Sequence, residues 1–219
     1  MATAALNKFA RFYGAEILRR SGANSRLGDL YDWEGIFNNR LTPVDDNLIN
    51  WVEPDAATRD ALRQQASAAP TFPASFAEVI DLTSSLQVGV KPDLPNIPQQ
   101  LAADLASKTV LNFHFEGVVL RPMPDELGIQ LRFLLDQYKT SHFDQYKQHL
   151  RPYDLAVSLF YARRVVLKLD HSVQVSAAAT SEVQALGGSV QVSADGHQDV
   201  EFNQSDCPFA VVLKAVHTY

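Results

Sequence analysis

Cysteine is almost absent from the chain, which has one, Cys207, among its 219 residues. A single cysteine excludes an intramolecular disulfide and a cysteine-ligated zinc or iron–sulfur site within one chain. Long apolar runs are also missing. No stretch reaches the roughly 18–20 apolar residues that a membrane-spanning helix needs, and the N-terminus lacks the apolar core of a secretory signal. We therefore expect a chain that is made as a soluble, cytoplasmic protein.

The familiar catalytic motifs are missing as well. The chain contains no GxGxxG, no GxxxxGK, no HExxH and no GxSxG. Its six histidines are dispersed, and a pair such as His142 and His149 without a third strong ligand is more often solvated than metal-bound. The sequence thus predicts no catalytic residue, no cofactor and no metal, and we expect a protein that is not an enzyme.

Basic charge is scarce over the whole chain, whose net charge is −6, and this sign argues against a main role in binding nucleic acid. The N-terminus is the exception, because its first 26 residues carry +4 while the remaining 193 carry −10. The cations there include Lys8, Arg11, Arg19 and Arg20. One interpretation is an ordinary solvated helix face, and the other is contact with anionic lipid.

Hydrophobic periodicity predicts helices in the first two-thirds of the chain and strands at its end. Leu6, Phe9, Tyr13 and Ile17 form one stripe of a helix over Thr3–Ser21 that Gly22 ends. The other expected helices are Asp55–Ala66, Asp125–Tyr138 and His142–Leu150. The expected strands are short ones with tight turns within 28–54, then Phe76–Thr83, Leu86–Val90, Thr109–Val119, Leu155–Tyr161, Val165–Val175, Ser189–Ala194, Asp199–Phe202 and Phe209–His217. Strands that follow one another without helical crossovers indicate an α+β fold in a single domain over 1–219.

One region stands out because it has so little charge. Residues 171–194 contain a single fully charged residue, Glu182, although 20% of the whole chain is charged. Its two ends repeat one alternation, in which Val173, Val175, Val190 and Val192 interleave with serine and glutamine. Such strands suit the rim of a soluble sheet, which is the commoner arrangement, or a closed membrane barrel with apolar side chains toward lipid.

The order of these segments resembles the pore-forming domain of gasdermins, particularly the short bacterial and fungal members, over roughly residues 75–219. The matching stretches are LQVGVKPDL, SKTVLNFHFEGVVLRPM, ELGIQLRFLLDQYK, PYDLAVSLFYARRVVLKLDHSVQVSA and the closing GGSVQVSADGHQDVEFNQSDCPFAVVLKAVHTY. Residues 1–70, with the basic helix, match this family poorly.

The resemblance implies a central twisted antiparallel sheet with flanking helices. It also implies that hairpins near Phe76–Val118 and Tyr161–Val216 refold, insert into membranes and assemble with other copies into a β-barrel pore that causes cell death, with a role such as antiphage defence. The partners would be further copies of the chain, acidic lipids that contact the basic N-terminal residues, and a protease or another trigger. The protein would be cytoplasmic when inactive and membrane-bound when activated. The alternative is a soluble α+β binding or regulatory module, with an exposed edge for strand addition by a partner.

Overall fold

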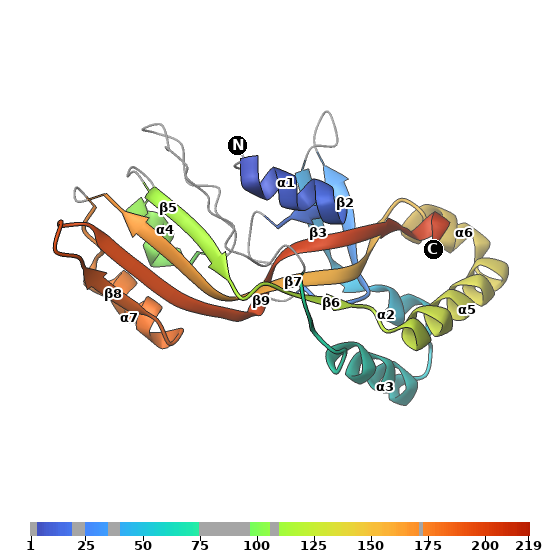
Figure 1. The fold of residues 1–219 in the computed structure, drawn as a ribbon. Helices are drawn as coiled ribbons and strands as arrows, with labels where there is room; N and C mark the ends of the chain where they lie inside the picture. Colours follow the sequence, from blue (N-terminus) through green and yellow to red (C-terminus); the bar gives the residue numbers. More distant parts are fainter. Residues whose placement is uncertain (1–3, 19–24, 35–39, 75–96, 106–109, 171–172) are drawn as a thin grey trace. The chain divides into compact units, whose positions relative to one another are not determined.

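Figure 1 shows the computed structural model of the chain, which describes residues 4–18, 25–34, 40–74, 97–105, 110–170 and 173–219. Helices and antiparallel strands make up its elements, so the α+β prediction is confirmed. The chain divides into two compact units. Unit 1 comprises Met1–Ala23, Pro73–Val119 and Phe160–Ala210, and unit 2 comprises Asn24–Phe72, Leu120–Leu159 and Val211–Tyr219. The single domain stays a prediction.

The sheet of unit 1 is antiparallel, and two long strands, β7 (Asp154–Leu169) and β9 (Gln198–Ala215), contribute to it. Strand β7 pairs with β9 on one side and with β5 (Val110–Glu116) on the other, while β1 (Ala15–Ile17) and β8 (Ser189–Val192) pair with β9. Alternate residues of β7, namely Val165, Leu167 and Leu169, are fully buried. This period of two fixes which face of β7 meets the core.

Aromatic side chains fill the core of unit 1. Phe9, from helix α1 (Ala4–Tyr13), is fully buried, and its ring centroid lies 4.9 Å from that of Phe160 and 5.5 Å from that of Phe209. On the other side, Phe115 of β5 stacks on Phe209 with centroids 4.2 Å apart. Tilted and edge-on pairs of this kind are the preferred aromatic arrangements, so the cluster packs α1 onto the sheet.

The predicted helix over Thr3–Ser21 is wrong in its length. Helix α1 ends at Tyr13, because Gly14 takes a positive φ of 61° that stops a right-handed helix. Ile17 therefore lies in strand β1, and the backbone N–H of Leu18 donates to the Phe209 carbonyl at 2.9 Å.

Three further sets of predictions are wrong. The strands predicted separately at Asp199–Phe202 and Phe209–His217 form one strand, β9. The sequence predicts separate strands at Leu155–Tyr161 and Val165–Val175, but β7 runs without a break and ends at Leu169. Val173 and Val175 then lead into helix α7 (Ala177–Ala185), which starts there because the Ser176 side chain accepts from the Ala179 N–H. The sequence also predicts no helix where α4 (Gln99–Leu105) forms. The strands predicted at 76–83 and 86–90 lie outside the described residues.

Unit 2 confirms most of the elements that the sequence predicts for it. Strands β2 (Asp29–Glu34) and β3 (Arg40–Asn47) confirm that short strands form within 28–54, and β2 also pairs with β7. Helix α3 (Ala56–Ser67) begins after its N-cap Asp55, and helix α5 (Asp125–Ser141) has the predicted start. Helices α2 (Leu48–Val52) and α6 (Phe143–Gln145), a π-helical turn (Tyr146–Leu150), a 3₁₀ turn (Val216–Thr218) and the short strands β4 (Phe72–Pro73) and β6 (Val119–Pro122) complete the elements.

The turn between β3 and α2 is organised by one side chain, that of Asn47. Its oxygen accepts from the Ile49 N–H at 3.0 Å, and its amide donates to the Leu27 carbonyl and the Asp29 carboxylate. Burial raises the pKa of Asp29, and the hydrogen bond from Asn47 opposes that shift. Gly28, at φ 88°, passes so close that a Cβ there would lie 2.9 Å from the Asn47 oxygen.

Helix α5 and the last residue of unit 2 border an open cavity of about 440 Å³. The Tyr219 hydroxyl donates to the Gly128 carbonyl at 3.2 Å, and its ring lies between Arg132 and Lys214, whose charged groups are 5.7 and 5.4 Å from the ring centroid. Burial raises the pKa of Tyr219, while the charge of Arg132 acts in the opposite direction. Tyr219 thus fastens β9 to α5 within this unit.

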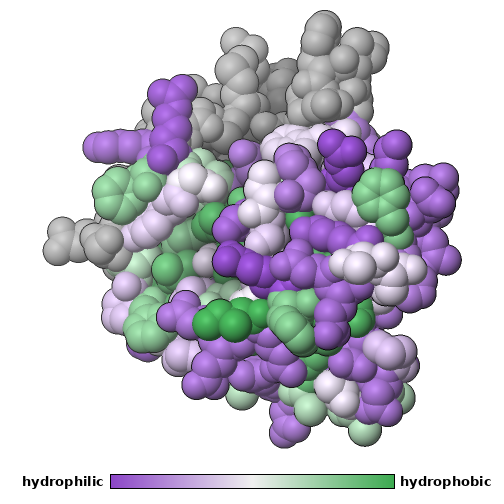
Figure 2. Space-filling model, turned by 90° about the vertical axis from the view of Figure 1, so that its right-hand side faces the viewer, coloured by the Kyte–Doolittle hydropathy of each residue, from purple (hydrophilic) through white to green (hydrophobic). Residues whose placement is uncertain are grey.

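Exposed hydrophobic side chains of unit 2 include Ile129, Phe133 and Phe143. On the face of the molecule that Figure 2 shows, hydrophobic side chains are scattered among hydrophilic ones. Single apolar side chains of this kind are ordinary on protein surfaces, and we assign them no partner.

Phe9→Ala should lower the free energy of unfolding by about 3–5 kcal/mol, because it removes a fully buried ring from the aromatic cluster. Urea unfolding followed by circular dichroism measures this change. The matched control is Phe12→Ala on the same helix, where the side chain is 62% exposed and the expected change is within about 0.5 kcal/mol. Equal changes in the free energy of unfolding for the two substitutions would contradict the conclusion that Phe9 belongs to the buried aromatic cluster.

Tyr219→Phe should lower the free energy of unfolding by about 1 kcal/mol at pH 8, because the hydrogen bond to Gly128 is lost. Burial raises the folded-state pKa of Tyr219 above the unfolded value of about 10. The contribution of the hydroxyl is therefore complete below that unfolded value and lost as pH rises through the folded-state pKa. Urea unfolding of both proteins between pH 8 and pH 11 checks this, and a difference that stays constant with pH would count against it.

Candidate functional site

Two of the four cations predicted to contact lipid lie on α1. Lys8 and Arg11 are both exposed, whereas Phe9 between them is buried against the sheet. Phe12, on the next position of the same helix, is 62% exposed. Arg19 and Arg20 lie outside the described residues. Helix α1 therefore presents an apolar ring beside two cations, a combination that suits the interfacial layer of an anionic membrane.

The fold holds this helix firmly in place. Phe9 and Tyr13 both pack on Phe160, with ring centroids 4.9 and 4.8 Å apart respectively. After Gly14, strand β1 adds to the edge of β9. Lys8 and Arg11 thus project from an element that is anchored to the sheet by side chains and backbone.

Strand β8 forms within the strand predicted at Ser189–Ala194, the second half of the proposed hairpin. Val190 and Val192 lie in β8, where Val190 pairs with Val200 and Val192 pairs with Gln198. Val192 is 70% exposed, and Val190 is half-buried. The sequence predicts the preceding turn at Gly187 and Gly188, and this turn needs glycine. Gly187 has a φ of 69°, and a Cβ on Gly188 would lie 1.9 Å from the Glu201 carbonyl oxygen.

The first half of that hairpin has another conformation in this state. Val173 is fully buried, and its N–H closes a turn to the Asp170 carbonyl at 2.9 Å. Val175 is half-buried, and its N–H donates to the side-chain oxygen of Gln198 at 3.1 Å. Since Gln198 is also the strand partner of Val192, the structure does bring the two valine pairs to the same part of unit 1.

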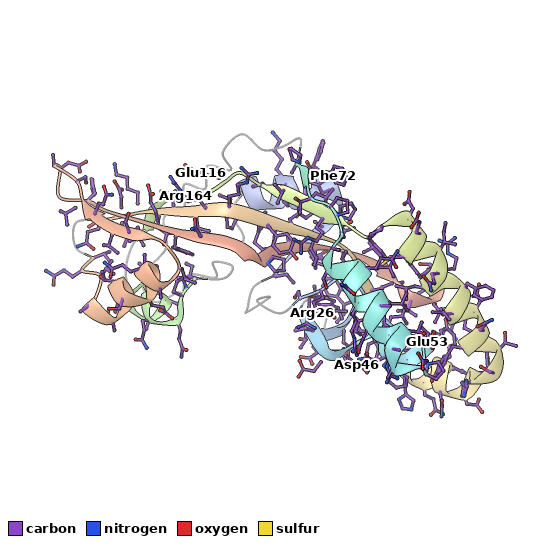
Figure 3. All side chains as sticks on the ribbon, turned by 90° about the horizontal axis from the view of Figure 1, so that it is seen from below. Arg26, Asp46, Glu53, Phe72, Glu116 and Arg164 are labelled. Carbon is purple, nitrogen blue, oxygen red and sulfur yellow. The ribbon has the colours of Figure 1, made fainter. Side chains whose placement is uncertain are left out.

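Ion pairs line the outward face of the sheet in unit 1. Arg164 of β7 lies between Glu116 of β5, at 3.6 Å, and Glu201 of β9, at 3.4 Å, and Figure 3 shows Glu116 beside Arg164. Farther along, Asp195 lies 4.0 Å from Lys168 and 3.5 Å from His197. A hydrogen bond from Ser193 lowers the pKa of Asp195, with smaller contributions from His197 and Lys168. From Arg164 to Leu169, β7 therefore places Arg164 and Lys168 on one face and the buried Val165, Leu167 and Leu169 on the other.

Two carboxylates to which the sequence assigns no role lie at helix ends in unit 1. Glu182 of α7 accepts from the first N–H groups of α4, and Asp104 of α4 accepts from the backbone at the start of α7. The sequence does contain a signal for them, because each is the single full charge of a low-charge stretch. Periodicity alone does not reveal their partners, since these lie more than 70 residues away.

Over the described ranges, no three side chains of His, Cys, Asp or Glu gather where they could bind a metal ion. The cavity beside Tyr219 is lined by mixed side chains and includes one carboxylate, that of Asp125. None of the helices in the described part of the chain is long and apolar enough to cross a bilayer.

Comparison with known proteins identifies the fold. Neither protein-family models nor curated proteins give a match to this chain. Among solved structures, a bacterial gasdermin from Bradyrhizobium tropiciagri is similar, with a TM-score of 0.52 and 14% sequence identity. The similarity covers 97% of this chain and 86% of that one. The chain therefore has a gasdermin-like α+β fold, with a large antiparallel sheet and flanking helices.

Proposed function

We propose that the chain is a pore-forming protein whose copies assemble and insert strands into a membrane. The observation that carries this proposal is the likeness of the fold to a bacterial gasdermin over 97% of the chain. The protein would stay in the cytoplasm until a protease or another trigger activates it. The pore would then permeabilise the membrane and cause cell death, for example in defence against phage.

Strands β7 and β9 have the length that insertion requires, and β7 has a suitable alternation from Arg164 to Leu169. A tilted transmembrane strand needs about 9–11 residues, and β7 and β9 have 16 and 18. In a barrel, Val165, Leu167 and Leu169 would face lipid, whereas Arg164 and Lys168 would face the water-filled interior. The ion pairs of β7 in the folded chain already lie on the face that would remain wet.

Insertion would require a change of conformation, because the apolar face of β7 is covered in this state. Val165, Leu167 and Leu169 have no exposed surface. Lipid would replace the protein core around these side chains, and neighbouring subunits would satisfy the peptide groups at the open strand edges. Assembly and insertion are therefore coupled in this proposal, since an unpaired edge in hydrocarbon is costly.

Val192→Asp should abolish dye release from vesicles that contain acidic lipid, because it places a charge on the lipid-facing side of the inserted hairpin. The matched control is Gln191→Asp, one residue away on the opposite side of β8. Both side chains are exposed in the folded chain, so both variants should fold and differ only in release. Val173→Asp is less informative, because Val173 is buried and its loss would destabilise the fold.

Release must first be established for the unmodified chain, both intact and after limited proteolysis. Absence of release in all these samples would contradict the pore and favour a soluble binding module. Equal loss of release in Val192→Asp and Gln191→Asp would contradict the assignment of the two faces. Circular dichroism of each variant confirms that the fold persists.

Lys8→Gln combined with Arg11→Gln should weaken binding to vesicles that contain phosphatidylserine by roughly thirtyfold. Each cation near an anionic surface contributes about 1 kcal/mol, and two are removed. The matched control is Lys147→Gln with Arg151→Gln, which removes two exposed cations from the π-helical turn of unit 2 and the residue after it. Vesicle flotation measures the binding. Similar losses of binding in both double variants would contradict the proposal that α1 has a particular role in contacting lipid.

A further inference from the structure

Two short helices of unit 1 pack against each other although they are more than 70 residues apart in the sequence. Helix α4 buries Leu101 and Leu105, and helix α7 buries Ala179 and Val183. Helices of seven and nine residues are too short to be stable alone in water, so each depends on its surroundings.

At its start, each helix donates a hydrogen bond to a carboxylate of the other helix, while the Ser176 side chain also caps the first turn of α7. One oxygen of Glu182 accepts from the Gln99 N–H at 3.1 Å, and the other accepts from the Gln100 N–H at 2.8 Å. In return, the Asp104 carboxylate accepts from the Ser176 N–H at 2.8 Å, and Ser176 is the N-cap residue of α7. We call this arrangement of Asp104 and Glu182 the reciprocal cap.

Each helix start lacks an acidic group of its own. Neither α4 nor α7 has an acidic residue in its first turn. The first N–H groups of a helix have no partner within the helix, and a negative charge there is favourable both as an acceptor and against the helix dipole. The reciprocal cap supplies that charge to each helix from the other one, so loss of either helix removes a cap from its partner.

The sequence on either side of each carboxylate has no other full charge. Asp104 is the single full charge between Asp93 and Lys108, and Glu182 is the single full charge from His171 to Ala194. A carboxylate is unfavourable on the lipid-facing side of a membrane strand. These two charges have a clear use in the helical state, where both are hydrogen-bonded to backbone donors.

We propose that the reciprocal cap holds the two low-charge segments as paired helices, and that it must open before either segment extends into a strand. This proposal rests on the pore function proposed above. The bonds are mutual, so opening one end releases both segments together. The reciprocal cap would therefore set how fast the protein converts, while the apolar faces set where it inserts.

Hydrogen exchange of the full chain, read by mass spectrometry, tests the first half of the proposal without a membrane. Glu182→Gln should speed exchange about tenfold (about 1.4 kcal/mol) in residues 99–105, because it removes the charged acceptor from the start of α4. It should also speed exchange in residues 177–185, since α7 loses its paired helix. Asp104→Asn should have the same effect on both segments.

Glu126→Gln is the matched control, because it removes an acidic residue from the first turn of α5, a helix of unit 2. It should leave exchange in both segments unchanged. Unchanged exchange in Glu182→Gln and Asp104→Asn would overturn the proposal. Faster exchange in only the directly capped helix would also overturn it, because the two helices would then open independently.

Dye release from acidic vesicles tests the second half. The double variant Asp104→Asn with Glu182→Gln should release dye about tenfold faster than the unmodified chain after the same activation. Faster exchange with an unchanged release rate would overturn the role of the reciprocal cap in conversion. Absence of release from the unmodified chain and every variant would contradict the pore function itself, and the exchange measurements would then still decide whether the two carboxylates hold the helices.

Discussion

The alternation of two chemically different faces along β7 is the constraint on which unit 1 depends. Val165, Leu167 and Leu169 need an apolar cover, and the aromatic cluster of Phe9, Phe160 and Phe209 forms part of the same core. The opposite face is polar and carries the ion pairs of Arg164 with β5 and β9. The same alternation suits a sheet in water and a strand between lipid and an aqueous pore, because both environments require one apolar and one polar side.

Local patterns predict much of the fold, and their failures have physical causes. The helix after Pro54, the strand around Phe115 and the helix from Asp125 all form where periodicity and caps predict them. Helix α1 ends at Tyr13, because Gly14 takes a positive φ. A sequence with two glycines near a helix end does not say which one leaves the helix, since the pairing of β1 with β9 decides it.

The predicted hairpin segments show even more clearly that local sequence does not determine conformation. Residues 172–176 and 189–193 both read Ser-Val-Gln-Val-Ser, yet the second forms β8 and the first ends at the N-cap of α7. Local propensity is identical in the two copies, so the difference comes from the residues next to each copy and from the elements packed against it. Lys8, Arg11 and Val192 are on the surface as a membrane role would require, whereas Val173 is buried. Burial of that kind depends on contacts that the sequence does not display.

Under the proposed pore function, the folded and the inserted conformations of one segment would together require that it carries few charges. A segment that is to enter lipid as a strand can carry few charges, because an ionised group on its apolar side is unfavourable there. A segment that is to remain folded in water until then needs something to hold it, and short helices with small buried faces hold weakly. Glu182 and Asp104 meet both demands, because one carboxylate in each segment caps the helix of the other. Arg164 meets them differently, since its partners Glu116 and Glu201 lie on a face that stays in water in either state.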